Sequence, residues 1–333
     1  MPDVPVDDSG PSRLSDVGED GLLRLIFPRL PVAAATLLGP GDDTAVVAAP
    51  DGRVVATTDV LVEGRDFRRD WSSAPDVGWK AAAQNLADVA AMGAVPTALL
   101  VGLVAPPELE VAWALGLADG LAAACAGTGA GVVGGDLSSG PVIVVSVTAL
   151  GDLQGRAPVL RSGARPGDVV AVAGALGRSG AGWELLELGR GDVAPELVAA
   201  HRRPTPPYAA GVAAAVAGAT SMLDVSDGLV RDLGRVARAS GVTIDLDWNL
   251  AADAFARPLW PANTALGRPE TDAMRWVLGG GEDHALAATF PPGVEPPVGF
   301  VPVGEVLPRV IGRPDVLLDG EPLDTLGWDH FRP

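Results

Sequence analysis

Lysine, cysteine and histidine are scarce in this chain of 333 residues, and their scarcity excludes several classes of protein. The single lysine, Lys80, does not follow a glycine-rich loop, so there is no P-loop, and it does not lie in the Val-Ala-Ile-Lys strand of a protein kinase. One cysteine, Cys125, cannot form an internal disulfide, and with only three scattered histidines it gives no zinc-site spacing. This composition predicts a cytoplasmic protein without a zinc site.

Positive charge and long apolar runs are also lacking. Lys and Arg number 24 against 42 Asp and Glu, so the net charge is −18, which argues against a nucleic-acid or anionic-membrane partner. No stretch of about 18 uncharged apolar residues occurs, so we expect no membrane span. The first twenty residues are acidic and have neither the basic start nor the apolar stretch of a signal peptide.

The length predicts two domains. Hydrophobic residues make up 48% of the chain, chiefly Ala, Val and Leu, which suits layers of helix and sheet. The segment 151–167 is dense in glycine and proline, so we place the domain boundary there, with one domain over 15–150 and the other over 151–333. Both halves mix strands and helices, so each is expected to be an α/β or α+β unit.

Periodicity and turn signals predict the order of elements in each half. In the first half we expect helices over 19–27, 75–92 and 108–126, and strands over 44–49, 53–58, 98–104, near 132 and over 142–148. Pro50-Asp51-Gly52 predicts a hairpin between the first two of these strands. In the second half we expect helices over 180–188, 195–200, 207–217, 229–240 and 271–278, and strands over 168–173, 222–225, 242–247, 284–290 and 300–306.

Acidic residues gather where the predicted strands end or turn, beside Gly, Ser or Thr. The four clusters are Gly39-Pro40-Gly41-Asp42-Asp43, Thr57-Thr58-Asp59, Gly134-Gly135-Asp136 and Asp224-Val225-Ser226-Asp227-Gly228. A further acid, Asp88, shares one face of a predicted helix with Lys80 and Gln84, because these positions are spaced by four. Carboxylates with hydroxyl neighbours are the hard oxygen ligands that Mg²⁺ prefers. Metal ions would also supply the positive charge that phosphate chemistry needs in a chain with one lysine.

Each cluster taken alone also fits an ordinary turn or helix cap, and Asp88 also fits a solvated helix face. The segment Gly129–Gly134 matches G-x-G-x-x-G, but it follows a predicted helix and enters a strand, whereas a dinucleotide fingerprint follows a strand and opens a helix. A glycine turn ending at Gly134-Gly135-Asp136 stays a candidate phosphate cradle, since bare backbone N–H groups bind anions.

The clusters, in this order and spacing, resemble the thiamine-monophosphate kinases, a family in the superfamily of aminoimidazole ribonucleotide synthetase and selenophosphate synthetase. The resemblance extends from about Gly18 to Phe331. It rests on the motifs Gly-Asp-Asp-Thr-Ala-Val, Thr-Thr-Asp-Val-Leu-Val-Glu-Gly, Val-Gly-Trp-Lys-Ala, Asn-Leu-Ala-Asp-Val-Ala-Ala-Met-Gly, Val-Gly-Gly-Asp, Asp-Val-Ser-Asp-Gly-Leu, Gly-Gly-Glu-Asp and Gly-Trp-Asp-His-Phe.

The resemblance implies a two-domain fold like that of aminoimidazole ribonucleotide synthetase, in which the N-terminal domains of a homodimer share a β-barrel. It also implies ATP as co-substrate in a cleft between the domains, several Mg²⁺ ions, a monovalent cation as a further candidate, and thiamine monophosphate as the acceptor. By position, the implied metal ligands are Asp43, Thr57, Thr58, Asp59, Asp88, Asp136, Asp224 and Asp227. The implied ATP contacts are Gly135, Asp136, Arg161 and Ser226, and the implied substrate contacts are Asp66, Glu282 and Trp328.

Two positions depart from the family pattern. The family often has His in Val-Glu-Gly-x-His-Phe, where this chain has Asp66, and an ionised carboxylate cannot donate a hydrogen bond. The family's His-x-Arg-Pro-x-Pro-Arg stretch ends here in Pro207 instead of Arg. The substrate end of the site is therefore the part in which this chain is expected to differ.

The implied reaction is direct transfer of the γ-phosphoryl group of ATP to the phosphate of thiamine monophosphate. A phosphate monoester loses its second proton near pH ~6, so the nucleophile is already anionic and no catalytic base is expected, in keeping with a site that has no well-placed histidine. Two alternatives stay open: another ATP-dependent enzyme resembling aminoimidazole ribonucleotide synthetase, and a nucleotide-binding homologue without activity. A selenophosphate synthetase would use a reactive N-terminal Cys or selenocysteine, and a hydrogenase-maturation relative a C-terminal Cys; this chain has only Cys125.

Overall fold

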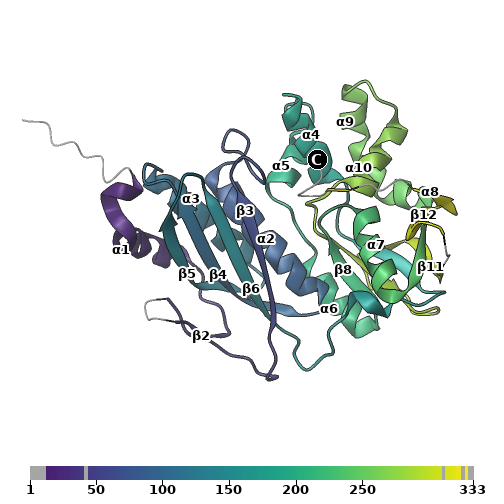
Figure 1. Ribbon diagram of the computed structural model, residues 1–333, viewed down its shortest axis with the longest axis horizontal. Helices are drawn as coiled ribbons and strands as arrows, with labels where there is room; N and C mark the ends of the chain where they lie inside the picture. Colours follow the sequence, from purple (N-terminus) through teal and green to yellow (C-terminus); the bar gives the residue numbers. More distant parts are fainter. Residues whose placement is uncertain (1–12, 41–43, 310–311, 324–326, 329–333) are drawn as a thin grey trace, which may run out of the picture.

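The computed structural model describes residues 13–40, 44–309, 312–323 and 327–328, which form two units side by side (Figure 1). The first unit contains a four-stranded sheet built from residues 55–152, and the second contains a seven-stranded sheet built from residues 169–322. We propose that the domain boundary falls in the connecting segment 153–168, close to the division predicted at 151. The fold is the expected α/β (α+β) arrangement of two domains.

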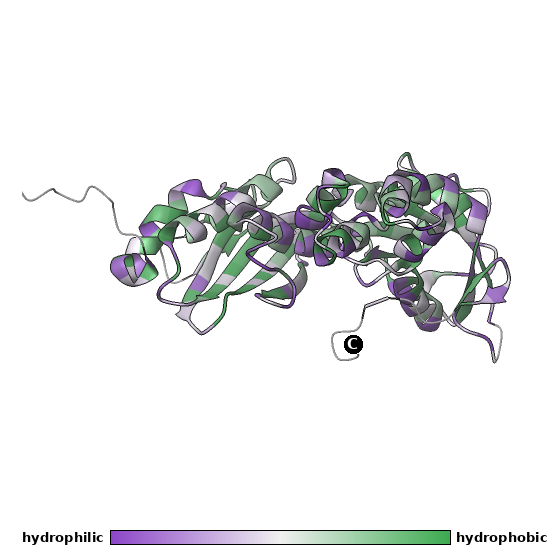
Figure 2. Ribbon diagram, turned by 90° about the horizontal axis from the view of Figure 1, so that it is seen from above, coloured by the Kyte–Doolittle hydropathy of each residue, from purple (hydrophilic) through white to green (hydrophobic). Residues whose placement is uncertain are grey.

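The sheet of the first unit carries two helices on one face. Its strands are β3 (Val55–Val62), β4 (Val95–Ala105), β5 (Gly131–Ser139) and β6 (Val144–Asp152), in the order β3-β6-β4-β5. Only β4 and β5 are parallel. Every second residue of β6 is buried, and polar and apolar bands alternate along the sheet (Figure 2). This period of two is that of a sheet with one covered face.

The covering helices, α2 (Ala74–Ala91) and α3 (Val111–Cys125), cross at two glycines. A Cβ on Gly78 would lie 2.1 Å from the carbonyl oxygen of Leu117, and a Cβ on Gly120 would lie 2.1 Å from that of Pro75. Side chains at either position would therefore force the helices apart. The capping box of Ser73 and Asp76 fixes the start of α2, as the predicted 75–92 helix requires.

The amino-terminal region differs from the prediction in its pairing. Helix α1 (Leu14–Ile26) begins earlier than predicted and includes Gly18, whose φ of 64° kinks it, before a short 3₁₀ turn η1 (Phe27–Arg29). Strand β2 (Val46–Val47) pairs with β1 (Thr36–Leu38), not with β3. The predicted hairpin around Pro50-Asp51-Gly52 is therefore wrong, because β3 takes its antiparallel partner from β6 instead.

The second unit is built on the sheet order β13-β12-β9-β11-β7-β10-β8. The strands are β7 (Val169–Ala173), β8 (Ser221–Val225), β9 (Val242–Leu246), β10 (Ala285–Phe290), β11 (Phe300–Pro308), β12 (Val316–Leu318) and β13 (Glu321–Pro322). All neighbours are antiparallel except β9 and β12. Strands β8 and β10 are buried along their whole length, so both faces of the sheet are covered there.

Helices surround this sheet on both faces. They are α4 (Arg178–Glu187), α5 (Pro195–Arg202), α6 (Tyr208–Ala217), α7 (Leu229–Ser240), α8 (Trp248–Ala251), α9 (Trp260–Ala265) and α10 (Ala273–Gly279), with shorter turns η2 (Arg161–Gly163), η3 (Ala252–Ala256), η4 (Arg257–Leu259) and η5 (Glu270–Asp272). Helices α4 to α7 and α10 match the predicted helices to within a few residues. The prediction missed β12 and β13 and left 248–270 irregular.

Helix α2 joins the two units. Its carboxyl-terminal residues Ala90 and Ala91 belong to an apolar cluster with Met222, Leu286 and Phe290 of the second sheet. Helix α6 crosses α2 so closely that a Cβ on Gly211 would lie 2.0 Å from the carbonyl oxygen of Ala90. The polar face of α2 is thereby held against the second unit. Among the described residues, no helix combines the length and apolar character needed to cross a bilayer.

Candidate active site

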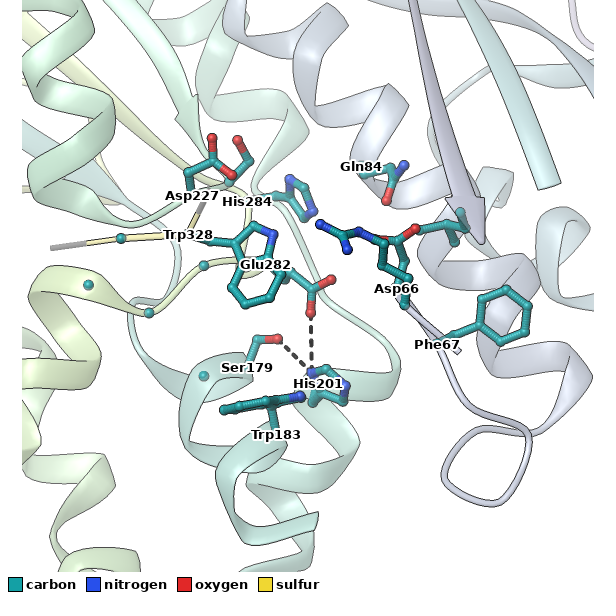
Figure 3. A pocket seen from close by; sticks show the side chains of 18 of the residues that line it. Asp66, Phe67, Gln84, Ser179, Trp183, His201, Asp227, Glu282, His284 and Trp328 are labelled. Atoms are coloured by element: carbon teal, nitrogen blue, oxygen red, sulfur yellow. Dashed lines mark hydrogen bonds and ion pairs between the residues drawn. The ribbon is translucent and has the colours of Figure 1, made fainter. Parts of the chain in front are cut away.

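A cleft of about 950 Å³ lies between the two units. Its walls come from the end of β3 and the loop after it, from α2, from α4, and from the turns that follow β8 and α10 (Figure 3). Nine predicted site residues line it: Asp59, Asp66, Asp88, Arg161, Asp224, Ser226, Asp227, Glu282 and Trp328. Residues up to about 270 positions apart in the sequence thus meet in one cavity.

Three predicted carboxylates approach one another from three different elements. Asp59 lies on β3, Asp88 on α2 and Asp224 on β8. Burial, followed by the negative charges of Asp224 and Asp59, raises the pKa of Asp88 to about 7, against the hydrogen bond of 2.7 Å that the hydroxyl of Thr57 donates to it. Carboxylates that repel each other in this way favour a cation among them.

The donor set fits magnesium better than a metal held wholly by protein. Within the described residues, no group of three or more His, Cys, Asp or Glu side chains is gathered around a single point. Magnesium usually takes one or two carboxylates, keeps several waters and completes its shell with substrate phosphates. Asp59, Asp88 and Asp224, which are close enough to influence one another's charge, suit that mode of binding.

A glycine-rich turn after α10 lies beside the turn that follows β8 and forms another part of the wall. Gly280 and Gly281 pass so close to Trp276 and Ser226 that a Cβ on either would lie within 2.4 Å of a backbone oxygen. Glu282 and His284 adopt positive φ angles of 63° and 54°, which non-glycine residues rarely do and which often mark a functional site. The backbone N–H groups of Glu282 and His284 donate to the carbonyls of Ser226 and Val225.

His284 faces the carboxylate cluster. Its Nδ1 lies 3.1 Å from Oδ2 of Asp224, and both side chains are buried. Burial alone would lower the pKa of His284, but the hydrogen bond to Asp224 and the charge of that carboxylate raise it. The sequence analysis placed no histidine at the site, whereas His284 and His201 both line the cleft.

The turn after β8 is shaped by a carboxylate that the prediction missed. Asp232 of α7 is fully buried, and its Oδ2 accepts the backbone N–H groups of Ser226 and Asp227 at 3.0 and 2.9 Å. Arg235, one turn further along α7, bridges the carboxylates of Asp232 and Asp227. Asp232 and Arg235 thus hold the backbone of Ser226 and the side chain of Asp227 in place. Ser226 is the predicted nucleotide contact and Asp227 a predicted metal ligand.

The only lysine is paired with a predicted substrate residue. Nζ of Lys80, on α2, lies 3.0 Å from Oε2 of Glu282, with side-chain exposures of 3% and 38%. Partial burial disfavours ionisation of Glu282, but Lys80 and then His201 overcome it and lower the pKa of Glu282 to about 2. This pair ties the two units together across the cleft.

Ser179, His201 and Glu282 resemble a hydrolase triad only in composition. Nδ1 of His201 lies 3.1 Å from Oγ of Ser179 and also 3.3 Å from Oε2 of Glu282. In a proton relay the two ring nitrogens serve different partners, whereas here one nitrogen faces both. Burial and then the charge of Lys80 lower the pKa of His201 to about 3, so the ring is neutral at physiological pH.

Asp66 shapes the turn that follows β3. Its Oδ2 accepts the backbone N–H of Val62 at 2.8 Å, and its own N–H donates to the carbonyl of Val62. Asp66 stands where the family often has histidine, and one oxygen of its carboxylate closes this turn. Trp328 is also a predicted substrate contact. Its backbone N–H donates to the carbonyl of Asp227.

Some predicted site residues do not line the cleft in the part of the chain that the structure describes. Thr57 reaches it indirectly through Asp88, while Thr58 donates its hydroxyl to the carbonyl of Val147 within the sheet. Gly135 and Asp136 lie inside β5, so the predicted glycine turn is instead a strand. Asp43 lies outside the described residues.

Close packing of the sheet explains why position 135 is a glycine. A Cβ there would lie 1.9 Å from the carbonyl oxygen of Val101 on β4, opposite it in the register. The strands can therefore approach only because this position carries no side chain.

Models of two protein domains match the chain. The N-terminal domain of AIR synthase related proteins matches residues 41–153, and the C-terminal domain of the same proteins matches residues 165–269. Together these matches cover more than half of the chain, so the chain is an AIR synthase related protein.

Curated relatives and solved structures identify the family within this class of protein. A thiamine-monophosphate kinase of Mycobacterium tuberculosis (strain ATCC 25618 / H37Rv) is 52% identical over 96% of this chain and 93% of its own length, and one of Escherichia coli (strain K12) is 35% identical over 94% and 98%. A structure described as AaThiL complexed with AMPPCP and TMP covers 97% of this chain and all of its own, with a TM-score of 0.76 and 33% identity. The chain belongs to the thiamine-monophosphate kinase family.

Proposed function

We propose that this chain uses ATP to phosphorylate thiamine monophosphate, giving thiamine diphosphate and ADP. The observation that carries the proposal is the composition of the cleft between the two units. It holds both a carboxylate cluster suited to phosphate-bound cations and an ionised glutamate near aromatic side chains. A substrate that has a phosphate at one end and a cationic aromatic ring at the other matches both features.

The proposed transfer is direct. An oxygen of the acceptor phosphate attacks the γ-phosphorus of ATP, a new P–O bond forms, and the bond to the β-bridging oxygen breaks as ADP leaves. The acceptor phosphate is largely dianionic at neutral pH, so no proton needs to be removed from it. The two cleft histidines agree with this, since His201 is neutral and shares one nitrogen between two partners, while His284 is engaged with Asp224.

Magnesium is the cofactor that we assign to the carboxylates. Asp59, Asp88 and Asp224 would hold it, with Asp43, Asp136, Asp227, Thr57 and Thr58 as further predicted ligands. When bound, the metal offsets the charge of the phosphate groups of both substrates. The protein contributes fixed ligand positions and the orientation of the reacting groups. A monovalent cation stays a further candidate.

Nucleotide and acceptor are assigned to different residues of the cleft. We assign Ser226 and Arg161 to ATP, as the resemblance implies, since both line the cleft, and keep Gly135 and Asp136 as predicted contacts that this chain does not bring into its own cleft. We assign Glu282, Trp328 and Asp66 to thiamine monophosphate. Lys80 keeps Glu282 ionised, which suits a positively charged ring.

We also propose a homodimer in the cytoplasm. The four-stranded sheet has helices on one face, while its other face presents Val60 and Leu100, which are 48% and 39% exposed. A second copy covering that face would bury these residues and build the shared β-barrel, and it would also decide where Gly135 and Asp136 lie in the assembly. The single thiol, Cys125, is buried and unpaired, in keeping with a reducing compartment.

The test is an assay of purified protein with ATP, MgCl₂ and thiamine monophosphate, in which thiamine diphosphate is measured by chromatography with and without EDTA. We expect product that depends on the metal. Asp59→Asn and Asp224→Asn should each lower turnover at least about 100-fold, because each removes a charge that orients the phosphates. Asp253→Asn, which removes an exposed acid paired with Arg257, is the matched control and should leave turnover unchanged.

Three results would redirect the assignment. Near-normal turnover in both cleft variants would refute the metal sites. Binding of ATP without any product would indicate a nucleotide-binding homologue that has lost activity. Turnover of ATP only with a different acceptor would indicate another enzyme of the superfamily, such as one resembling aminoimidazole ribonucleotide synthetase.

A further inference from the structure

Tryptophan side chains gather in the cleft although phosphoryl transfer does not require them. Of the eight tryptophans in the chain, four line the cavity: Trp71, Trp183, Trp276 and Trp328. Phosphate groups are bound by cations and hydrogen-bond donors, not by aromatic faces. The tryptophans therefore concern the part of the ligand that is not phosphate.

Two of these rings already have a partner within the protein. Trp276 is only 4% exposed, and its indole N–H donates to Oε2 of Glu184 at 2.8 Å. The guanidinium of Arg68 covers the ring of Trp71, with its central carbon 4.2 Å from the ring centroid. Trp183 and Trp328 also line the cavity, and their exposed fractions of 45% and 47% leave a large aromatic surface open to a ligand.

Trp183 lies on a stripe of α4 that forms one wall of the cleft. Ser179, Trp183 and Glu187 are spaced by four, so they share one helix face, and all three line the cavity. Ser179 is fixed by its contact with His201, which anchors the first turn of the stripe. Figure 3 shows Trp328 above Ser179 and Trp183 below it, with the carboxylate of Glu282 beside them.

We propose that Trp183 is a specificity-determining residue whose indole contacts the cationic heteroaromatic ring of the acceptor. The inference rests on the proposed function, since it concerns the acceptor of that reaction. An aromatic face attracts a cation through its negative quadrupole, and the attraction grows when the site excludes water. The carboxylate of Glu282, held ionised by Lys80, adds a full negative charge to the same cavity.

The test compares Trp183→Leu, which keeps apolar bulk but removes the ring, with Trp183→Phe, which keeps a smaller ring. For Trp183→Leu we expect KM for thiamine monophosphate to rise roughly 3- to 30-fold, equivalent to about 0.7–2 kcal/mol at about 1.4 kcal/mol per tenfold. KM for ATP should stay within about twofold. Trp183→Phe should recover most of the loss, because a phenyl face keeps part of the quadrupole.

Charge selectivity separates stacking from simple packing. The 3-deaza analogue of thiamine monophosphate has the same shape but a neutral ring, and its inhibition constant can be compared with KM for the charged substrate. Wild-type protein should prefer the charged ring, and Trp183→Leu should lose a large part of that preference. A purely structural role would instead change both constants by the same factor.

Leu188→Ala is the control, since Leu188 is 52% exposed at the end of the same helix and does not line the cleft. It should leave both KM values unchanged. An active wild type in which Trp183→Leu keeps KM for thiamine monophosphate and the charge preference would overturn the role of Trp183 alone. An inactive wild type would instead refute the proposed function, so the two failures are distinguishable.

Discussion

The pair formed by Lys80 and Glu282 allows a prediction with a definite asymmetry. Lys80 is 3% exposed and Glu282 is 38% exposed, so the two charges differ in their access to water. After Lys80→Met, the carboxylate of Glu282 can still be hydrated from the cleft. After Glu282→Gln, the ammonium group of Lys80 stays buried without its counter-charge. We therefore expect Glu282→Gln to be the more destabilising of the two changes.

The magnitude follows from the distance of 3.0 Å between Nζ and Oε2. Two unit charges at that separation attract by about 5.5 kcal/mol at an effective dielectric constant of about 20. Desolvation of Lys80 and solvent screening at the half-exposed Glu282 offset most of this attraction. A coupling free energy of about 1–3 kcal/mol should remain, with losses of about 1–2 kcal/mol for Lys80→Met and about 2–4 kcal/mol for Glu282→Gln.

A double-mutant cycle measures the coupling. Urea unfolding of the wild type, both single variants and the double variant can be followed by tryptophan fluorescence, without substrate, at low ionic strength. The double variant should be more stable than the sum of the single losses predicts. A coupling below about 0.5 kcal/mol, or a larger loss from Lys80→Met than from Glu282→Gln, would refute the reasoning from burial.

Three further predictions concern residues around the site. Burial raises the pKa of Asp283 from 3.8 to about 7, although the backbone N–H groups of Ser179 and Gly177 donate hydrogen bonds that lower it. The carboxyl group therefore ionises more readily in the unfolded chain, and the folded protein loses stability as the pH rises from about 4 to about 7. Asp283→Asn, which does not titrate, should gain about 2–3 kcal/mol over wild type between pH 5 and pH 8 in urea unfolding, and an unchanged difference would contradict this. Gly135→Ala should cost about 1–3 kcal/mol in the same measurement because its Cβ meets a backbone oxygen of β4, and a cost no greater than that of Gly134→Ala would contradict the steric argument. Asp66→Asn keeps an oxygen for the turn, so KM for thiamine monophosphate should stay within about twofold, whereas Asp66→Ala should raise it several-fold; equal KM values would show that the turn does not need this acceptor.

The local residue pattern was enough to predict most helices and strands, but not which strands pair with one another. The residues of β2 and β3 flank a strong turn signal, yet β3 pairs with β6, about 90 residues later. A hairpin prediction weighs only the residues beside the turn, and it cannot include the alternating burial that β6 offers. The short strands β12 and β13 were missed for a related reason, because two or three residues carry no periodicity.

The candidate site was predictable where a residue's role follows from its own chemistry. Asp59, Asp88 and Asp224 were identified as oxygen ligands, and the structure brings them into one cleft. His201 and His284 were missed because a lone histidine gives no spacing signal. Asp232 gave a signal, since it lies eight residues after Asp224 in the same acidic segment, but only the fold shows that it holds the turn from behind.

The burial of Lys80 has a practical consequence for the chemistry of the whole chain. Every other basic side chain apart from the histidines is an arginine, so the side chains offer amine-directed reagents one target, and that target is 3% exposed and ion-paired. Modification of Lys80 would require the two units to separate along α2. The rate at which a small acylating reagent labels this lysine, detected as a single mass increment on the peptide containing it, would therefore report opening of the cleft without any engineered probe. Ligands that close the cleft should slow the labelling.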